Sequence, residues 1–232
     1  MDEILILSGA GLSAESGLKT FRDSGGLWEE YNVMEVCSIQ GFEKDRQKVL
    51  DFYDERRAQL KNSNPNLAHK TIAKIKEKYK DKVSVLTQNV DDLLEKAGCK
   101  NVIHLHGELT KLRCEDCNCE FYIGYESQKS KICPQCNSKK VRHAIVMFGE
   151  MAPMYQILYE KLEKMKLFVC IGTSGEVLDV KSYARMAKFS ILNNLEYSNL
   201  NMYFSKSYNE SATKAILKIE KDIENFVKND KI

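Results

Sequence analysis

Four cysteines form the strongest chemical signal in this sequence. Cys114 and Cys117 make one C-x2-C pair, and Cys133 and Cys136 make a second pair after residues 118–132. Pairs at this spacing are typical of a zinc site, and four thiolates fill a tetrahedral shell without leaving a position for water. Cys119 is a competing ligand, but the paired spacing favours the quartet. We therefore expect one structural Zn²⁺ ion rather than a catalytic one.

Small residues close the first apolar run of the chain. The run ends in Gly9, Ala10 and Gly11, whose spacing differs from the G-x-G-x-x-G pattern of the common dinucleotide fingerprint. Two interpretations follow. The glycines form only a tight turn, or they let backbone N–H groups come close to a phosphate.

Three later apolar runs also end in polar turns. They end in Gln88–Asp91, Gly172–Ser174 and Asn194–Glu196. Amides, hydroxyls and a carboxylate at strand ends suit a ribose, a carboxamide or a phosphate. The same residue types also cap helices, so taken one at a time these turns leave both interpretations open.

Two histidines lie near the end of one of these runs. His104 and His106 alternate with Leu105, which predicts that both project from one face of a strand. A lone histidine is more often structural than catalytic. His106 directly precedes Gly107 at the expected ligand end, and this favours His106 as a general base.

The stretch FYDERRAQL has the pattern of an amphipathic helix. Tyr53 and Arg56 are three residues apart and therefore share one helical face. They either form a solvated surface pair, with Asp54 and Glu55 as partners for the arginine, or bind an anion together. Arg57 points elsewhere on the helix and is expected to be an ordinary surface arginine.

The elements that must position these residues alternate along the chain. Strand-like apolar runs occur at 3–11, 82–89, 101–107, 166–174, 189–196 and 201–207. Helical patterns cover 45–61, 67–80, 90–96, 155–166 and 212–227. The alternation predicts an α/β fold with a largely parallel sheet covered on both faces, and with ligands at the carboxyl ends of the strands. The polar segment 112–141 breaks the pattern and is expected to depend on zinc for its stability.

The overall composition excludes several classes of protein. The 35 basic and 33 acidic residues nearly cancel to a net charge of +2, which argues against a nucleic-acid binder. No apolar run reaches the roughly 20 residues that cross a bilayer, so no membrane association is expected. The N-terminus shows no signal peptide, and a cytoplasmic location is expected. No obligate protein partner is evident.

Taken together and in order, these motifs resemble the sirtuin family of NAD-dependent protein deacylases. The resemblance is to the class III bacterial members, of desuccinylase and demalonylase type. The matching stretches are residues 9–28, 87–93, 104–107, 146–150, Gly172–Ser174, Asn194–Glu196 and the two C-x2-C pairs. The resemblance covers nearly the whole chain.

The resemblance implies a Rossmann-like parallel-sheet domain with a smaller inserted zinc-binding and helical module. One sirtuin-type catalytic domain would span 1–232. Its Rossmann-like part would comprise about 1–28, 81–110 and 145–232. The small module would comprise about 29–80, which is helical, and 111–144, which binds zinc.

The resemblance also assigns roles to residues. His106 would be the catalytic base. The acyl-lysine substrate would be bound by Tyr53, Arg56, Val146, Phe148 and Gly149. NAD would be bound by Gly9, Ala10, Gly11, Ala14, Thr20, Phe21, Arg22, Trp28, Gln88, Asn89, Val90, Asp91, Gly172, Thr173, Ser174, Asn194, Leu195, Glu196 and Ser211.

The implied reaction removes acyl groups from protein lysines and releases nicotinamide and 2′-O-acyl-ADP-ribose. A Tyr-x-x-Arg pair in this helix marks relatives that prefer succinyl or malonyl over acetyl, because a guanidinium suits a carboxylate. The alternative activity is mono-ADP-ribosyl transfer from NAD. The sequence departs from the family at Lys19 and His143, where proline is usual, and in the segment GEVLDVKSYA after Gly172–Ser174.

Overall fold

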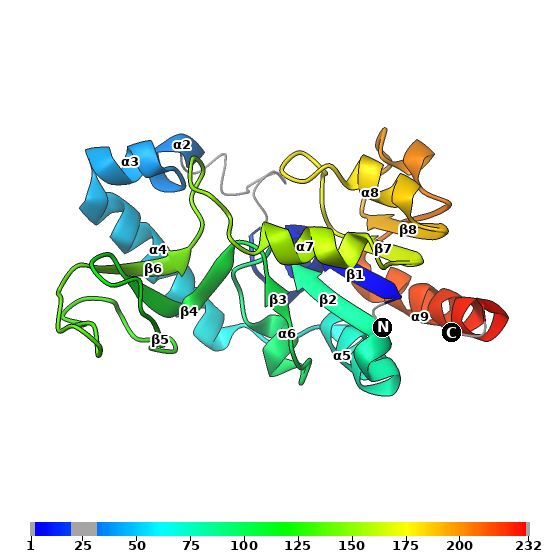
Figure 1. Cartoon of the computed structure of the whole chain (residues 1–232), viewed down its shortest axis with the longest axis horizontal. Coiled ribbons are helices and arrows are strands. Elements are labelled where there is room, and N and C mark those ends of the chain that lie inside the picture. The colour runs from blue at the N-terminus through cyan, green and yellow to red at the C-terminus, as the bar shows by residue number, and fades with distance from the viewer. Residues whose placement is uncertain (1–2, 20–31, 231–232) are drawn as a thin grey trace.

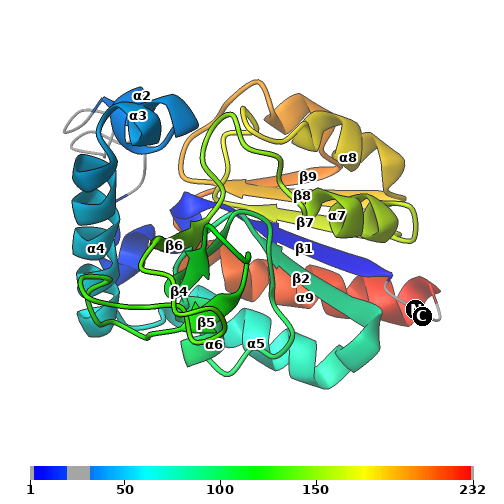
Figure 2. The ribbon, with the colours of Figure 1, turned by 60° about the vertical axis from the view of Figure 1, so that its left-hand side comes forward.

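The computed structural model describes residues 3–19 and 32–230. Its larger sheet contains six strands, all parallel, in the order β3-β2-β1-β7-β8-β9. The strands are β1 (Ile4–Ser8), β2 (Val83–Thr87), β3 (Ile103–His104), β7 (Leu167–Ile171), β8 (Phe189–Asn194) and β9 (Lys206–Asn209). Figure 2 shows the twisted sheet with helices on both sides. The α/β fold with a parallel sheet is confirmed.

Alternating side chains explain why the central strands are buried on both faces. In β1, Ile4 and Ile6 pack with α5 (Leu67–Tyr79), α6 (Leu93–Lys96) and α9 (Ala212–Asp230). Leu5 and Leu7 pack on the other face with α7 (Tyr155–Leu162) and α8 (Val180–Met186). Two apolar layers therefore enclose the sheet, and its carboxyl edge is left for polar residues.

A second, three-stranded sheet lies at the other end of the molecule (Figure 1). Strand β4 (Gly107–Cys114) pairs antiparallel with both β5 (Glu120–Tyr122) and β6 (Val141–Ile145). Helices α2 (Val33–Val36), α3 (Ile39–Lys44) and α4 (Arg46–Asn62) lie beside it. Within residues 3–19 and 32–230 there are also four 3-10 turns, at Ala10–Leu12, Ala14–Ser16, Lys80–Lys82 and Asn201–Tyr203. The division of the chain into a Rossmann-like part and a small module stays a prediction.

Local capping explains where the long helices begin. Asp45 accepts a hydrogen bond from Lys48 N at the start of α4. The Asn66 side chain accepts hydrogen bonds from the backbone N–H groups of Ala68 and His69 at the start of α5. In turn, the His69 ring accepts a hydrogen bond from Asn66 N. This reciprocal pair fulfils the role of a capping box with histidine in the place of glutamate.

Several predicted boundaries are wrong. The helix expected at 90–96 begins only at Leu93, because the Val90 carbonyl accepts a bond from Leu109 N and Asp91 caps Leu93 N. The strand expected at 201–207 is a 3-10 turn followed by β9. Within the strand expected at 101–107, the observed strand β3 ends at His104. His106 therefore lies beyond the strand, in a turn. Among the described residues no helix has the length and apolar character needed to span a membrane.

Candidate functional site

Three glycines bring two strand ends into backbone contact. Gly9 and Gly11 follow β1, and Gly172 follows β7. Gly11 N donates to Gly172 O at 2.9 Å, and a Cβ on Gly9 would lie 2.7 Å from the same oxygen. Gly172 has a φ of +68°, and a Cβ there would lie 2.4 Å from Leu12 N. Any side chain at these positions would push the two turns apart, so the bare backbone forms a closely packed cradle at the carboxyl edge of the sheet. The N–H groups of the three glycines are used within it, since they donate to Ile171 O, Gly172 O and Asn193 O.

Polar side chains from three strands meet beside this cradle. Gln88 Nε2 donates to Thr173 Oγ1 at 3.1 Å, and Asn194 Nδ2 donates to Thr173 O at 3.0 Å. Leu195 and Glu196 are exposed beyond β8. The fit of NAD to this edge rests on the glycine cradle together with these amide and hydroxyl groups.

Side-chain hydrogen bonds hold neighbouring parts of the same edge. Ser211 lies at the start of α9, where Glu15 accepts bonds from Thr213 N and Oγ1. Asn193, which the sequence reasoning missed, is buried and bridges the carbonyls of Tyr208 and Glu210.

Ser13 is a hub that the sequence reasoning also missed. Its hydroxyl donates to Asp91 Oδ2 at 2.9 Å and accepts from Asn89 Nδ2 at 3.2 Å. His69 Nδ1 accepts from Asn66 N, so its other nitrogen, Nε2, carries the proton that points at Ser13 Oγ, 3.3 Å away. Burial lowers the pKa of His69 to about 4, so the ring is neutral. Two features of the sequence could have indicated this hub. They are a serine in the loop that follows Gly11 and a histidine three residues after the helix-capping Asn66.

His106 is held in one tautomer by two partners. Its Nδ1 lies 3.0 Å from Gln88 O, which can only accept, so Nδ1 carries the proton. Nε2 lies 2.9 Å from the Tyr155 hydroxyl, which therefore donates to it. Burial lowers the pKa of His106. The ring is thus neutral at neutral pH, with its basic nitrogen directed toward Tyr155.

His104 has the opposite electrostatic setting. Burial opposes its protonation, but the hydrogen bond and charge of Glu95, 2.9 Å from Nε2, raise its pKa. Nδ1 donates to Asn89 O at 3.0 Å and so fixes the backbone beside the Ser13 hub. Two neighbouring histidines with pKa values pushed in opposite directions favour a structural role for His104 and leave His106 as the candidate base.

The segment Val146–Gly149 is anchored by backbone bonds. Val146 N donates to His106 O, Phe148 N donates to Cys37 O at 2.8 Å, and Ile39 N donates to Phe148 O. Glu150 accepts from Met147 N and pairs with Arg142 and Arg113. Phe148 stays 42% exposed, and Gly149 has a φ of +91°. Pairing of this segment with a substrate stays a prediction.

Tyr53 and Arg56 are withdrawn from the surface. Tyr53 is 7% exposed, and burial, followed by the neighbouring Cys37 thiol, raises its pKa well above 10.0. The Arg56 side chain is 12% exposed, pairs with Glu55 at 2.9 Å and lies over the Phe52 ring at 5.5 Å. Both residues lie near Cys37, whose carbonyl accepts a hydrogen bond from Phe148 N, and so they lie beside the anchored segment.

The prediction of a surface position for Arg57 is wrong. Arg57 is 0% exposed and donates to Leu109 O, Lys111 O and Glu126 O, and it pairs with Asp54 at 3.1 Å. Burial lowers its pKa to about 10, so it remains charged. The segments that carry these three carbonyl groups pack over Arg57 and bury it. The helical pattern of α4 alone does not indicate these contacts.

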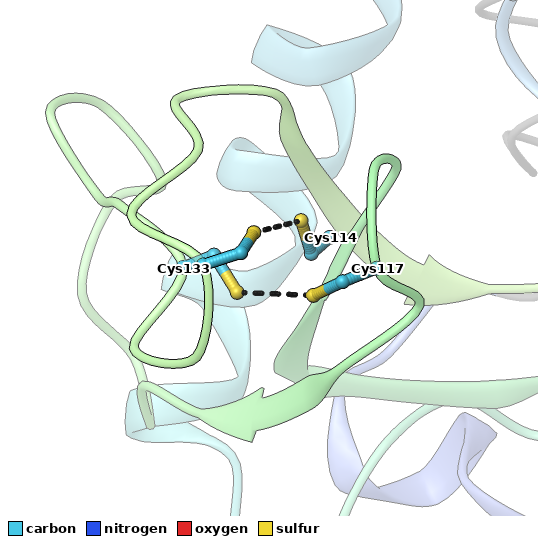
Figure 3. A group of neighbouring side chains, drawn as sticks. Cys114, Cys117 and Cys133 are labelled. Carbon is cyan, nitrogen blue, oxygen red and sulfur yellow. Dashed lines mark hydrogen bonds between the residues drawn. The ribbon is translucent and has the colours of Figure 1, made fainter.

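The cysteine quartet forms a compact group of thiols (Figure 3). Sγ of Cys114 lies 3.6 Å from that of Cys136, and Sγ of Cys117 lies 3.5 Å from that of Cys133. A tetrahedron with Zn–S bonds of about 2.3 Å places its sulfurs about 3.8 Å apart, so the quartet fits one structural Zn²⁺. Cys119 instead contacts Glu120 O. Cys37, Cys99 and Cys170 are buried in apolar clusters.

The remaining predicted residues have mixed outcomes. Ala10 and Ala14 lie in the turns that follow β1, and Val90 bonds β4 through Leu109 N. Ser174 follows Thr173 at the end of β7. Thr20, Phe21, Arg22 and Trp28 lie outside the described residues.

Comparisons with known proteins agree with this arrangement. A family model described as the Sir2 family matches residues 9–179. An NAD-dependent protein deacylase of Campylobacter jejuni is 60% identical over 233 residues and covers 100% of both chains. A solved mutant Sir2 homologue bound to ADP-ribose has a TM-score of 0.86 at 33% identity, over 97% of this chain and 93% of that one. A Sir2 homologue–NAD complex has a TM-score of 0.83 at 32% identity, over 97% and 90%.

Proposed function

The chain belongs to the Sir2 family and is an NAD-dependent protein deacylase, and from that premise we propose that it removes succinyl-type acyl groups from lysines in preference to acetyl. The observation that supports this preference is the withdrawn position of Arg56 beside Tyr53. The Arg56 guanidinium pairs with Glu55 and presents a planar fork of N–H donors. A carboxylate at the end of the acyl chain could accept from that fork, whereas a methyl group could not.

The NAD end of the proposed site consists of backbone and amide groups. Gly9, Ala10, Gly11 and Gly172 supply the cradle, and Thr173 and Asn194 are proposed to contact a ribose. Ala14, Val90, Leu195, Glu196 and Ser211 stay predicted contacts. Gln88, Asn89 and Asp91 are proposed to contact the nicotinamide half, and their bonds to Thr173 and Ser13 support that role by fixing their side chains. When bound, NAD supplies the sugar carbon that accepts the acyl oxygen as nicotinamide leaves.

The protein's own contribution is orientation and proton transfer. His106 keeps Nε2 unprotonated because Gln88 O fixes the proton on Nδ1. A neutral imidazole can take a proton at Nε2 from a sugar hydroxyl held against it. The link from His106 O to Val146 N sets the distance between this base and the segment proposed to hold the substrate.

A carboxylate entering the acyl site would have a competitor already in place. Glu55 is 55% exposed and pairs with Arg56 at its open side. An acidic acyl group would take the place of Glu55, whose exposed side chain can turn into water. The phenol of Tyr53, which lies near the Cys37 thiol, would supply a second donor to the acyl carboxylate.

Steady-state turnover of succinyl-, malonyl-, glutaryl- and acetyl-lysine peptides, with and without NAD, tests this proposal. The expected result is NAD-dependent turnover with a higher kcat/KM for the acidic acyl groups. Arg56→Met should reduce kcat/KM on succinyl-lysine by about 10-fold or more and spare acetyl-lysine, since loss of a charge-assisted bond amounts to about 1.5–3 kcal/mol. Lys61→Met, an exposed cation of the same helix, is the matched control. Equal losses of kcat/KM on both peptides in the Arg56 variant would refute a role for Arg56 in binding the acyl carboxylate.

Mass spectrometry of the reacted peptide addresses the rival activity. Loss of the acyl group supports deacylation. Gain of ADP-ribose on the protein or peptide, with the acyl group retained, would support mono-ADP-ribosyl transfer instead.

A further inference from the structure

The basic nitrogen of His106 already has a partner from the protein itself. Nε2 lies 2.9 Å from the Tyr155 hydroxyl, and the two rings are 5.9 Å apart at an angle of 49°. Since Nδ1–H is bonded to Gln88 O, Nε2 offers the ring's single in-plane lone pair, and the phenol donates to it. The atom that must receive a substrate proton is therefore covered.

Tyr155 is firmly placed to make this contact. It is the first residue of α7, and its ring packs against the apolar cluster that contains Leu7, Leu105 and Leu158. Burial raises the pKa of the phenol, so Tyr155 keeps its proton and acts as a donor. The helix begins six residues after Gly149, so the same stretch of chain that is proposed to hold the substrate also positions the phenol.

One lone pair cannot accept two well-aligned hydrogen bonds at once. A sugar hydroxyl that gives its proton to His106 must first bond to Nε2, where the Tyr155 hydroxyl now lies. We propose that Tyr155 is a placeholder: it takes the position of the sugar hydroxyl in the unliganded enzyme, holds His106 in its active tautomer, and is displaced when the sugar binds. This inference rests on the proposed role of His106. In the opposing mechanism Tyr155 stays in place and relays the proton.

Equilibrium binding separates the placeholder from the relay. ADP-ribose carries a second ribose that can reach His106, and ADP does not. If Tyr155 must be displaced, Tyr155→Phe should bind ADP-ribose about two- to tenfold more tightly than the wild type, because one neutral hydrogen bond no longer has to be broken. The affinity for ADP should stay the same. Tyr159→Phe, an exposed tyrosine one turn along α7, is the matched control and should match the wild type with both ligands.

Kinetics with a saturating acylated peptide give a second readout. In Tyr155→Phe the KM for NAD should fall by a similar factor while kcat does not fall with it. A loss of kcat of more than about 100-fold in a folded variant would fit a missing proton relay and would overturn the proposal.

Nitrogen NMR of His106 reports on the contact directly. The Nε2 resonance of the unliganded wild type should move in Tyr155→Phe and should not move in Tyr159→Phe. An unmoved resonance, or equal ADP-ribose affinity in wild type and Tyr155→Phe, would overturn the placeholder. Absence of ADP-ribose binding by the wild type would instead refute the proposed cofactor site, so the two failures are distinguishable.

Discussion

His143 Nε2 lies 3.0 Å from Oδ1 of Asp54, and this pair joins strand β6 to helix α4. The His143 ring also lies 5.5 Å from the ring of Tyr53, the residue before Asp54. Asp54 accepts further bonds from Ser127 and Gln128 and pairs with Arg57. The helix that carries the proposed acyl-reading pair is therefore fixed to the zinc-binding region by one buried polar network.

Replacement of Arg57 by methionine should destabilise the protein strongly. The substitution leaves Asp54 without its cation and three buried carbonyl groups without their donor. Removal of one member of a buried ion pair costs about 3–5 kcal/mol. Urea unfolding measures the loss. Lys48→Met, which breaks an exposed pair with Glu35, is the control and should change the free energy of unfolding by less than about 1 kcal/mol. Similar small decreases in the free energy of unfolding in both variants would show that the Arg57 network contributes little to stability.

The Asp54 network should make stability depend on acid pH. Burial opposes the charge of Asp54, but hydrogen bonds from His143, Ser127 and Gln128 hold its pKa below 3.8. The unfolded chain then takes up the proton first as the pH falls. The stabilisation by Asp54 is complete above about pH 3.8 and is lost as the pH falls through the lower, folded pKa.

Asp54→Asn removes the group that titrates. Its unfolding free energy should be lower than that of the wild type at pH 7, and the gap should narrow below pH 3.8. Urea unfolding at a series of pH values between 7 and 3 checks this. A gap that stays constant over the whole range would mean that Asp54 is not the source of the dependence.

Activity should persist to mildly acidic pH and then fall. Burial lowers the pKa of His106 below 6.5, and only the neutral ring can accept a proton. The kcat/KM profile should therefore show an acid limb with an apparent pKa under 6.5, and activity at pH 7 should be close to maximal. His106→Ala should remove turnover of every acyl group at all pH values. An acid limb above pH 6.5 would contradict the neutral, buried base.

Zinc should be retained by the quartet and not by Cys119. Cys114 and Cys133 are part of the small apolar cluster of their region, together with Leu112 and Val141, so the metal and the core are one unit. Metal analysis after dialysis against a chelator should find one zinc per chain in the wild type and in Cys119→Ser, and none in Cys133→Ser. Limited proteolysis should then cut the latter between 112 and 141. Zinc loss from the Cys119 variant would change the assigned ligand set.

Local sequence signals predicted the fold class well. The alternation of apolar runs and helical patterns is a property of short stretches, and burial on both faces of a parallel sheet explains why β1, β2 and β7 are buried along their whole length and largely apolar. The zinc ligands were equally readable because two C-x2-C turns need no distant information. The end of the strand before His106 was less readable, since backbone bonds from other segments decide where pairing stops.

The sequence by itself determined which chemical groups stand at which strand ends, because turns follow strands in chain order. It could not determine which of those groups are paired. Arg57 lies next to Arg56 and has the same side chain, yet Arg57 donates to three carbonyls that are 52, 54 and 69 residues away, whereas Arg56 pairs with the adjacent Glu55. Ser13, His69 and Tyr155 become part of the site in the same way. Burial and hydrogen bonding depend on segments that are distant along the chain, so only the tertiary structure decides them.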